Sequence, residues 1–463
     1  MKLKSDRTAL CLGLAMICFS IPAKAQTGQP QAETPKSGLM RFAEQDYLLG
    51  TWGGLRSNLS SNGVDFEFVY FNAVPTDVSG GIKQGSVYEG ALLMMLDLDS
   101  EKLAGYKGGQ LHAGGLYLHS GRAFGEHFVG DLNKTSLLDF PDSLRLWELW
   151  YEQKFFDRKV SLKVGQLAID RDFILPEFYN SLASISFLNQ TFFYPTLAFN
   201  VYDIAGLPPR HHALASTPYG APGARLRIDP SEKWYLQAGV YDGNPDRSWS
   251  GTDFKLSAEE GALAYFEATY RLNQAKDDEG LEGNWKLGGY FHTGSFLDVG
   301  TATSVAFGLS PGPYVDHPNN YGLYFLADQY LYRETTKADP AKQGLVGFFR
   351  VAGAPKDRNL TQFGIDGGLV YKGLIPGRDW DTFGVAASYL EISRDISNVY
   401  VAAGLPKPDY EAVIEGSYKA QLTAWWTVQP SIQWVMHPGG RTDFTRPPIP
   451  DALVVIVQTS LRF

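Results

Sequence analysis

Two acidic residues and a tryptophan recur at every second position in one extended segment of the chain. Glu148, Trp150 and Glu152 therefore share one face if the segment is a β-strand, and Arg225 and Arg227 do so in a later segment. Carboxylates and guanidinium groups hydrogen-bond to pairs of sugar hydroxyls, and an aromatic ring packs against the C–H face of a sugar. The pattern fits weak sugar recognition. The alternative is a wet wall on which opposite charges balance.

A second charged group stands at the start of a long connection that runs from Arg171 to Gly220. Asp170, Arg171 and Asp172 can anchor this connection by ion pairs or can hold a cation. Anchoring is the simpler interpretation. His211 and His212 lack a further spaced ligand, so we predict no metal site.

No motif of a known catalytic class is present. The chain contains no G-x-S-x-G, H-E-x-x-H or P-loop spacing. Glu148 and Glu152 resemble the paired carboxylates of glycosidases, but four strand residues separate their Cα atoms by about 13 Å, which exceeds the usual carboxyl separation. We therefore predict no enzyme activity and no cofactor.

The elements that position these residues are expected to be β-strands. Residues 145–156 and 160–170 alternate with period two and are separated only by a tight turn, which predicts a hairpin. The face of the first strand opposite Glu148 is expected to point outward and carries Arg145, Trp147, Leu149, Tyr151 and Gln153. No helical stretch is available to cover such apolar faces, so they must contact lipid while the polar faces line water.

Sixteen segments of this kind follow one another, an even number as single-chain bacterial barrels require. They cover roughly 64–74, 87–98, 110–120, 144–156, 160–170, 221–229, 233–243, 261–272, 284–296, 320–334, 344–354, 361–374, 381–393, 409–423, 425–438 and 452–463. The second and tenth are ambiguous, which leaves fourteen or eighteen strands open. Short connections follow most even-numbered strands and longer ones follow odd-numbered strands. The predicted fold is an all-β transmembrane antiparallel β-barrel, most simply of 16 strands, spanning residues 64–463.

The N-terminal region is expected to lie outside the barrel. Residues 1–25 have the basic start, apolar run and Ala23-Lys24-Ala25 site of a signal peptide. Their removal takes away both cysteines, four positive side chains and one negative side chain, which changes the formal charge from −9 to −12. Such an acidic chain is a poor nucleic-acid binder. Residues 26–63 are expected to form a periplasmic leader with a short helix near Gly54–Ser60.

The last predicted strand ends on an aromatic residue. One face of this strand carries Leu453, Val455, Val457, Thr459, Leu461 and Phe463, and the chain stops at Phe463. A terminal aromatic on an alternating strand is similar to the assembly signal of bacterial outer-membrane barrels, so we expect the barrel-assembly machinery to be a partner.

Four segments, in order and at similar spacing, resemble the OprB-type carbohydrate-selective porins. They are Leu48–Phe66 (LLGTWGGLRSNLSSNGVDF), Leu144–Phe155 (LRLWELWYEQKF), Val164–Phe173 (VGQLAIDRDF) and Leu236–Pro245 (LQAGVYDGNP). The resemblance implies a sixteen-stranded barrel in the outer membrane of a Gram-negative bacterium, with a short periplasmic N-terminal helix, that conducts sugars by facilitated diffusion.

The predicted function is the passive uptake of mono- or oligosaccharides into the periplasm. A general or other-solute porin on the same scaffold is one alternative, and a secreted carbohydrate-binding β-protein is another from a different class. A barrel-embedded enzyme such as an outer-membrane lipase is a remote third. The expected partners are small sugars and outer-membrane lipid, and monomer and trimer stay open. Whether the connection from Arg171 to Gly220 enters the pore is also left open here.

Overall fold

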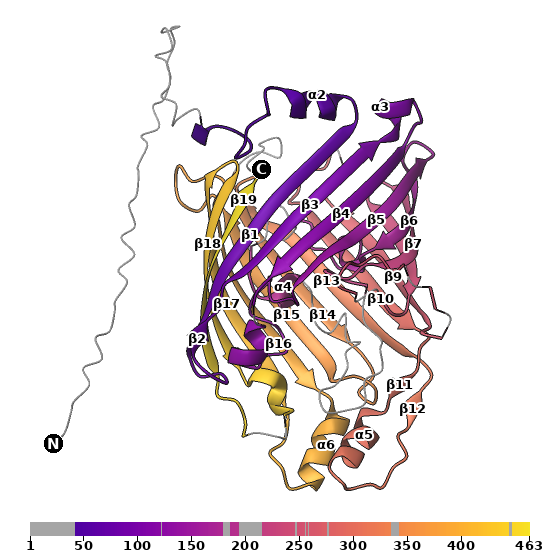
Figure 1. Ribbon diagram of the computed structural model, residues 1–463, viewed down its shortest axis with the longest axis vertical. Coiled ribbons are helices and arrows are strands. Elements are labelled where there is room, and N and C mark those ends of the chain that lie inside the picture. Colours follow the sequence, from indigo (N-terminus) through magenta and orange to yellow (C-terminus); the bar gives the residue numbers. More distant parts are fainter. Residues whose placement is uncertain are drawn as a thin grey trace, which may run out of the picture. The chain divides into compact units, whose positions relative to one another are not determined.

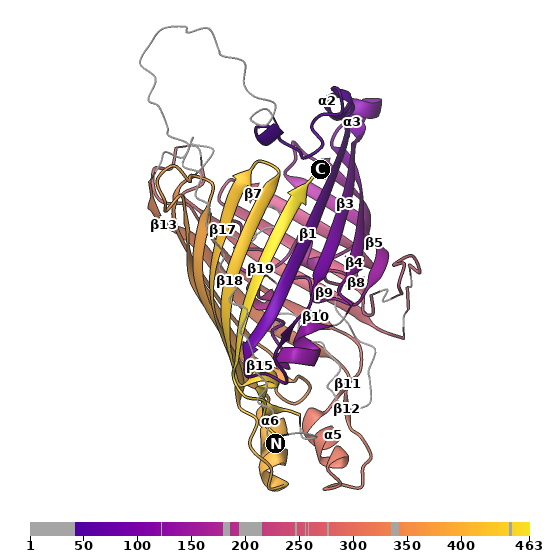
Figure 2. The ribbon, with the colours of Figure 1, turned by 60° about the vertical axis from the view of Figure 1, so that its left-hand side comes forward.

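Sixteen long antiparallel strands form a closed barrel (Figures 1 and 2). The structure is a computed structural model and describes residues 42–463, except 122, 179–185, 194–214, 246–247, 255, 258, 276, 335–341 and 444–446. The ring closes because β1 pairs with β3 on one side and with β19 on the other.

The predicted strand number is confirmed, and each observed strand overlaps its predicted segment. The barrel strands are β1 (Val64–Ser79), β3 (Glu89–Asp99), β4 (Gly109–His119), β5 (Ser143–Phe155), β6 (Val160–Leu167), β7 (Ala221–Ser231), β8 (Trp234–Asp242), β9 (Ala262–Leu272), β10 (Gly283–His292), β13 (Asn320–Arg333), β14 (Gly344–Gly353), β15 (Thr361–Lys372), β16 (Thr382–Ile392), β17 (Tyr410–Thr423), β18 (Trp426–Met436) and β19 (Ala452–Arg462). A two-residue strand, β2 (Gly85–Ser86), pairs antiparallel with the end of β1, and β11 (Phe296–Leu297) pairs with β12 (Asp316–His317) outside the ring.

In the part of the chain that the structure describes, helices occur only at the ends of the barrel and in its loops. The described ones are α2 (Leu55–Ser61), α3 (Ser100–Ala104), α4 (Gln190–Phe193), α5 (Val299–Ala306) and α6 (Arg394–Ala402), with single turns at Gly125–Val129, Ile169–Arg171 and Pro438–Arg441. The short helix expected near Gly54–Ser60 corresponds to α2. No helix in the described part of the chain is long and apolar enough to cross a membrane.

The two ends of the barrel differ. Short turns, α2, α3 and the C-terminus lie at one end, and α5 and α6 project from the other (Figures 1 and 2). In outer-membrane barrels the short turns face the periplasm. We therefore call the end with the C-terminus the periplasmic end.

The period-two alternation places side chains as expected in most strands. In β9 Phe266 is 48% exposed on the outer face, whereas Glu267 is buried on the inner face. In β7 Leu226 and Ile228 point outward, opposite to Arg225 and Arg227.

The face assignment was wrong for the first half of β5. The register with β4 shifts so that Gly114 is opposite Glu148 but Gly115 is opposite Leu146, which leaves Trp147 as an extra residue, a β-bulge. The side chain of Trp147 is buried among inward-facing residues, and Arg145 packs 4.5 Å from the ring of Tyr219. A bulge reverses the alternation, so Arg145 and Trp147 face the lumen and not the outer surface.

The lumen is also less polar than the alternation predicted. Inward-facing Val454 and Ile456 of β19 are fully buried, because loop residues such as Phe128 and Phe192 fold inside the ring and pack in the same apolar cluster. The barrel thus has a core of its own, supplied by two inner loops.

Candidate functional site

The long connection after β6 enters the barrel, where carboxylates of the wall hold its backbone. The amide of Ile174 donates to Glu267 at 3.0 Å. The amides of Glu177 and Phe178 both donate to Asp328 at 2.8 Å. A buried carboxylate that accepts backbone N–H groups satisfies donors that would otherwise lack partners. The described segment 171–178 is therefore fixed against β9 and β13.

A second part of the same connection reaches the opposite wall. Glu415 of β17 accepts hydrogen bonds from the amides of Leu188 and Asn189 at 2.8 and 2.9 Å. The side chain of Asn189 donates to Gln433 of β18 at 3.0 Å. The connection thus crosses the lumen from the wall that carries β6 to the wall that carries β17 and β18.

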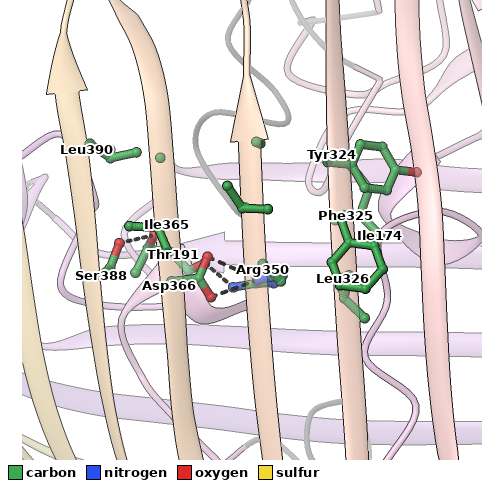
Figure 3. Close-up of a pocket in the computed structure, with 13 residues that line it drawn as sticks. Ile174, Thr191, Tyr324, Phe325, Leu326, Arg350, Ile365, Asp366, Ser388 and Leu390 are labelled. Atoms are coloured by element: carbon green, nitrogen blue, oxygen red, sulfur yellow. Dashed lines mark hydrogen bonds and ion pairs between the residues drawn. The ribbon is translucent and has the colours of Figure 1, made fainter.

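Between these two attachments the loop meets a charged pair on the wall (Figure 3). Arg350 of β14 binds Asp366 of β15 at 2.8 Å and donates to the main-chain oxygen of Thr191 at 2.6 Å. The hydroxyls of Thr191 and Ser388 lie 3.2 Å apart. The adjoining space is only about 20 Å³, room for about one water molecule, so loop and wall are in contact here and leave no passage.

The connection between β4 and β5 also folds inward. Glu411 of β17 accepts from the amides of Leu132 and Asn133 at 2.7 and 2.8 Å. This loop joins the longer one, since the amide of Gln190 donates to the oxygen of Lys134 at 2.9 Å. Sequence reasoning missed Glu411, Glu415, Glu267 and Asp328. Their signal was a carboxylate at an inward-facing position of an alternating strand.

The strand register aligns the candidate residues in two rows. Asp97, His112 and Trp150 are successive partners across β3, β4 and β5. Glu152, Lys163 and Arg225 are successive partners across β5, β6 and β7. Strands β5 and β7 are separated by β6, yet both present charged side chains to the same part of the lumen.

Trp150 is part of the first row, and Glu148 lies beside this row on the same strand. The Trp150 ring stacks on His112 with centroids 4.7 Å apart, and the Lys163 ammonium lies 4.5 Å from its centroid. Glu148 is buried and lies 3.4 Å from Nε of Arg171. Arg171 and Asp97 are the more accessible charged groups here, with side chains 28% and 35% exposed.

The second row is a closed network of ion pairs. Nη2 of Arg225 donates to Glu152 at 2.8 Å and to Asp172 at 3.3 Å. Nζ of Lys163 lies 2.8 Å from Asp172. Burial disfavours the charged form of Asp172, but Lys163 and Arg225 hold its pKa below the usual value. Arg225 itself is buried.

Asp170 joins the two ends of the long connection. It accepts hydrogen bonds from the amide and the hydroxyl of Thr217 at 2.9 and 2.6 Å, and the amide of Ile169 donates to Ala215. Burial raises the pKa of Asp170 to about 6, although the Thr217 hydrogen bonds and nearby Arg171 favour the charged form.

Arg227 lies apart from this group. It forms a bidentate pair with Asp229 at 2.8 and 3.1 Å and stacks over the ring of Tyr235 at 3.9 Å. None of its hydrogen bonds or ion pairs in the described part of the chain reaches Glu148, Glu152 or Arg225. The structure therefore brings four of the five sugar-contact candidates together and separates the fifth.

Phe463 is tied into the seam where the barrel closes. Its amide donates to the oxygen of Phe68 in β1 at 2.9 Å. His211 and His212 lie outside the described residues. Within the described residues, no three His, Cys, Asp or Glu side chains are grouped so that they could hold a metal ion.

The chain is similar to known porins in sequence and in fold. Residues 83–463 match the family model described as carbohydrate-selective porin, OprB family. The chain is 25% identical over 418 residues to Porin B of Pseudomonas aeruginosa, covering 85% of this chain and 87% of that protein. It is 23% identical to the putative porin QuiX of Acinetobacter baylyi, covering 91% and 94%. A high-pH structure of Pseudomonas putida OprB superimposes with a TM-score of 0.76 at 22% identity, covering 91% of this chain and 99% of that one.

Proposed function

From the premise that the chain belongs to the OprB family of carbohydrate-selective porins, we propose where in the barrel sugars are selected. The chain is an outer-membrane porin for carbohydrates, and its family and fold are those of porins and not of enzymes. Sugars pass through the part of the lumen that the two inner loops leave open. They meet polar contacts where Arg171, at the base of the long loop, faces the row that contains Asp97 and Trp150.

The exposed and the buried charged residues around the two rows have different roles, and this difference supports the proposed site. Arg171 and Asp97 are partly exposed and offer a donor and an acceptor for neighbouring hydroxyls. Glu148, Glu152 and Arg225 are buried and already paired, so they act by positioning the exposed groups. Trp150 holds Lys163 and His112 in place through ring contacts.

Asp170, Arg171 and Asp172 are the proposed anchors of the long loop. Each holds a different partner: Thr217 for Asp170, Glu148 for Arg171, and Lys163 with Arg225 for Asp172. Anchoring and selection are coupled, because Arg171 contributes to both. This loop narrows the lumen, and the sugar exchanges water for side-chain hydrogen bonds at its base.

Binding along such a route must stay weak. A channel site has to be favourable enough to fill and shallow enough to empty. We expect millimolar affinity for a sugar, about −4 kcal/mol.

We also propose how the chain is exported and assembled. Residues 1–25 act as a signal peptide, residues 26–63 as a periplasmic leader that includes α2, and residues 64–463 as the barrel. Phe463 is the assembly signal read by the barrel-assembly machinery. The barrel conducts without catalysis or cofactor, whether single or as a trimer.

The test is the ion current through single channels in a planar bilayer, with and without glucose. We expect glucose to reduce the wild-type current and expect Arg171→Gln to weaken this block at least fivefold, since a hydrogen bond to a charged group contributes roughly 1.5 to 3 kcal/mol. Arg227→Gln is the matched control, because it removes the same charge outside the cluster and should leave the block unchanged.

Two results would favour a general porin instead. One is a wild-type channel whose current glucose does not reduce. The other is equal passage, in liposome swelling, of glucose and of uncharged non-sugars of the same size.

A further inference from the structure

A separate cavity of about 770 Å³ opens near the periplasmic end of the barrel. It is bounded by strands β13 to β17, by the turn between β15 and β16, and by Glu177 of the inner loop. None of its lining residues belongs to the sugar-contact group described above. The lining residues that carry polar or aromatic chemistry are Lys342, Lys372, Trp380, Thr382, Lys419 and Gln421.

Three of these residues form one row across adjacent strands. Lys372 of β15 is opposite Thr382 of β16, which in turn is opposite Lys419 of β17. The alternation of β17 turns Lys419 inward together with Gln421 and with the buried residues Glu415 and Ser417. Strands two apart in a sheet are separated by about 10 Å. The two lysines therefore flank a gap that a small anion can enter.

Lys419 lacks the partner that its burial requires. The residue is only 9% exposed, and within the described residues its ammonium has no hydrogen bond and no ion pair. A buried ammonium without a counter-charge is costly. Such a group is expected where a ligand supplies the missing charge during function.

The rest of the cavity does not neutralise it. Glu177 is the one acidic side chain among the described lining residues, and it is engaged by Lys286 at 3.0 Å and by the Tyr235 hydroxyl at 2.9 Å. Lys372 adds a second positive charge, 4.4 Å from the centroid of Trp380. The cavity is therefore electropositive.

We propose that this cavity binds acidic sugars, with the carboxylate between Lys419 and Lys372 and the ring against Trp380, Thr382 and Gln421. Trp380 is 51% exposed, and the volume lies within the usual range of small-molecule sites, about 300 to 1,000 Å³. An inorganic anion would fill little of it. The site rests on the proposed passage of sugars through this lumen and adds sugar acids to the substrates, captured on the periplasmic side of the loop.

The experiment compares the concentrations of glucuronate, glucose and acetate that give half-maximal block of single-channel current when added from the periplasmic side. In wild type, glucuronate should block at a lower concentration than either acetate or glucose. Lys419→Gln should raise the glucuronate value about tenfold, the effect of one charged hydrogen bond, and should leave the glucose value unchanged. Lys419→Arg should restore most of the block.

Lys233→Gln is the matched control, because Lys233 lies in a turn at the same end of the barrel and is half exposed. Heat-modifiable migration on gels shows whether each variant is folded, and Lys372→Gln provides a second test if Lys419→Gln does not fold. Unchanged glucuronate block in the folded variants overturns the proposal, as does acetate block equal to that of glucuronate. Failure of glucose to pass the wild-type channel would contradict the proposed function. Glucose passage and glucuronate block are separate measurements, so each proposal can fail without the other.

Discussion

Nη1 of Arg56 donates a hydrogen bond of 2.7 Å to the main-chain oxygen of Phe463, which joins helix α2 to the last residue of the barrel. Nη2 of the same guanidinium donates to the oxygen of Phe66 in β1 at 2.6 Å. Arg56 is buried, and its guanidinium carbon lies 3.5 Å from the centroid of Tyr47. One side chain outside the strands therefore bridges the first and last strands of the ring.

We expect Arg56→Met to destabilise the closed barrel, because it leaves two main-chain oxygens without their charged donor, at a cost of roughly 1 to 3 kcal/mol each. The measurement is the temperature at which the folded band converts to the unfolded band in heat-modifiability gels. Arg158→Met, at an exposed turn between β5 and β6, is the control. Equal transition temperatures for the two variants would show that the bridge contributes nothing.

Deletion of Phe463 should lower the amount of assembled protein in the outer membrane. It removes the amide that pairs with Phe68 and the oxygen that accepts from Arg56. Phe463→Tyr keeps both backbone groups and an aromatic ring and should assemble normally. Wild-type levels of the truncated protein in the membrane fraction would contradict an assembly role.

Phe266→Arg should impair assembly, since a charge on the lipid face near the midplane costs roughly 2 to 4 kcal/mol. The lumenal control is Gln421→Arg, which lines the periplasmic cavity and should assemble normally, while it changes conductance and solute binding in that cavity. Glu267 is unsuitable as this control because it holds the amide of Ile174 and the hydroxyl of Tyr324. The measurement is the amount of folded barrel in the membrane fraction. Equal amounts of the two variants would contradict the face assignment of β9.

The base of the long loop should become less stable as the pH rises. Because burial raises the pKa of Asp170 from 3.8 to about 6, folding favours the protonated form. The stabilisation of the folded loop base by protonated Asp170 is fully present below about pH 4. It is lost as the pH passes through 6, and the loss is roughly 3 kcal/mol at most. Hydrogen exchange of the Thr217 amide, compared at each pH with Asp170→Asn, measures the effect. Parallel pH profiles for the two proteins would rule out this source of the dependence.

Glu415→Ala should release the long loop from β17, because the buried amides of Leu188 and Asn189 lose their acceptor. Each unsatisfied donor costs roughly 1 to 3 kcal/mol. We expect higher conductance and weaker discrimination among solutes, measured by liposome swelling with sugars of increasing size. Glu101→Ala, in the exposed helix α3, should behave as wild type.

The sequence by itself predicted the order and approximate bounds of sixteen strands, with fourteen and eighteen left open, and the structure confirmed sixteen. Period-two alternation is a local property, so pairs such as Phe266 and Glu267 reveal the outer and inner faces without any knowledge of neighbours. The same locality explains the error in β5. An extra residue at Trp147 is visible only against the register of β4, and alternation read along one strand carries no information about its partner.

Only the tertiary structure decided what fills the lumen and which charges meet. Glu152 and Arg225 are 73 residues apart and bind at 2.8 Å because Lys163, on the strand between them, places both in one row. Glu415 was identifiable as an inward-facing carboxylate, but its partners Leu188 and Asn189 lie more than 220 residues away in a loop without periodic pattern. Long-range pairs of this kind depend on barrel closure and on strand register, which sequence alternation leaves undetermined.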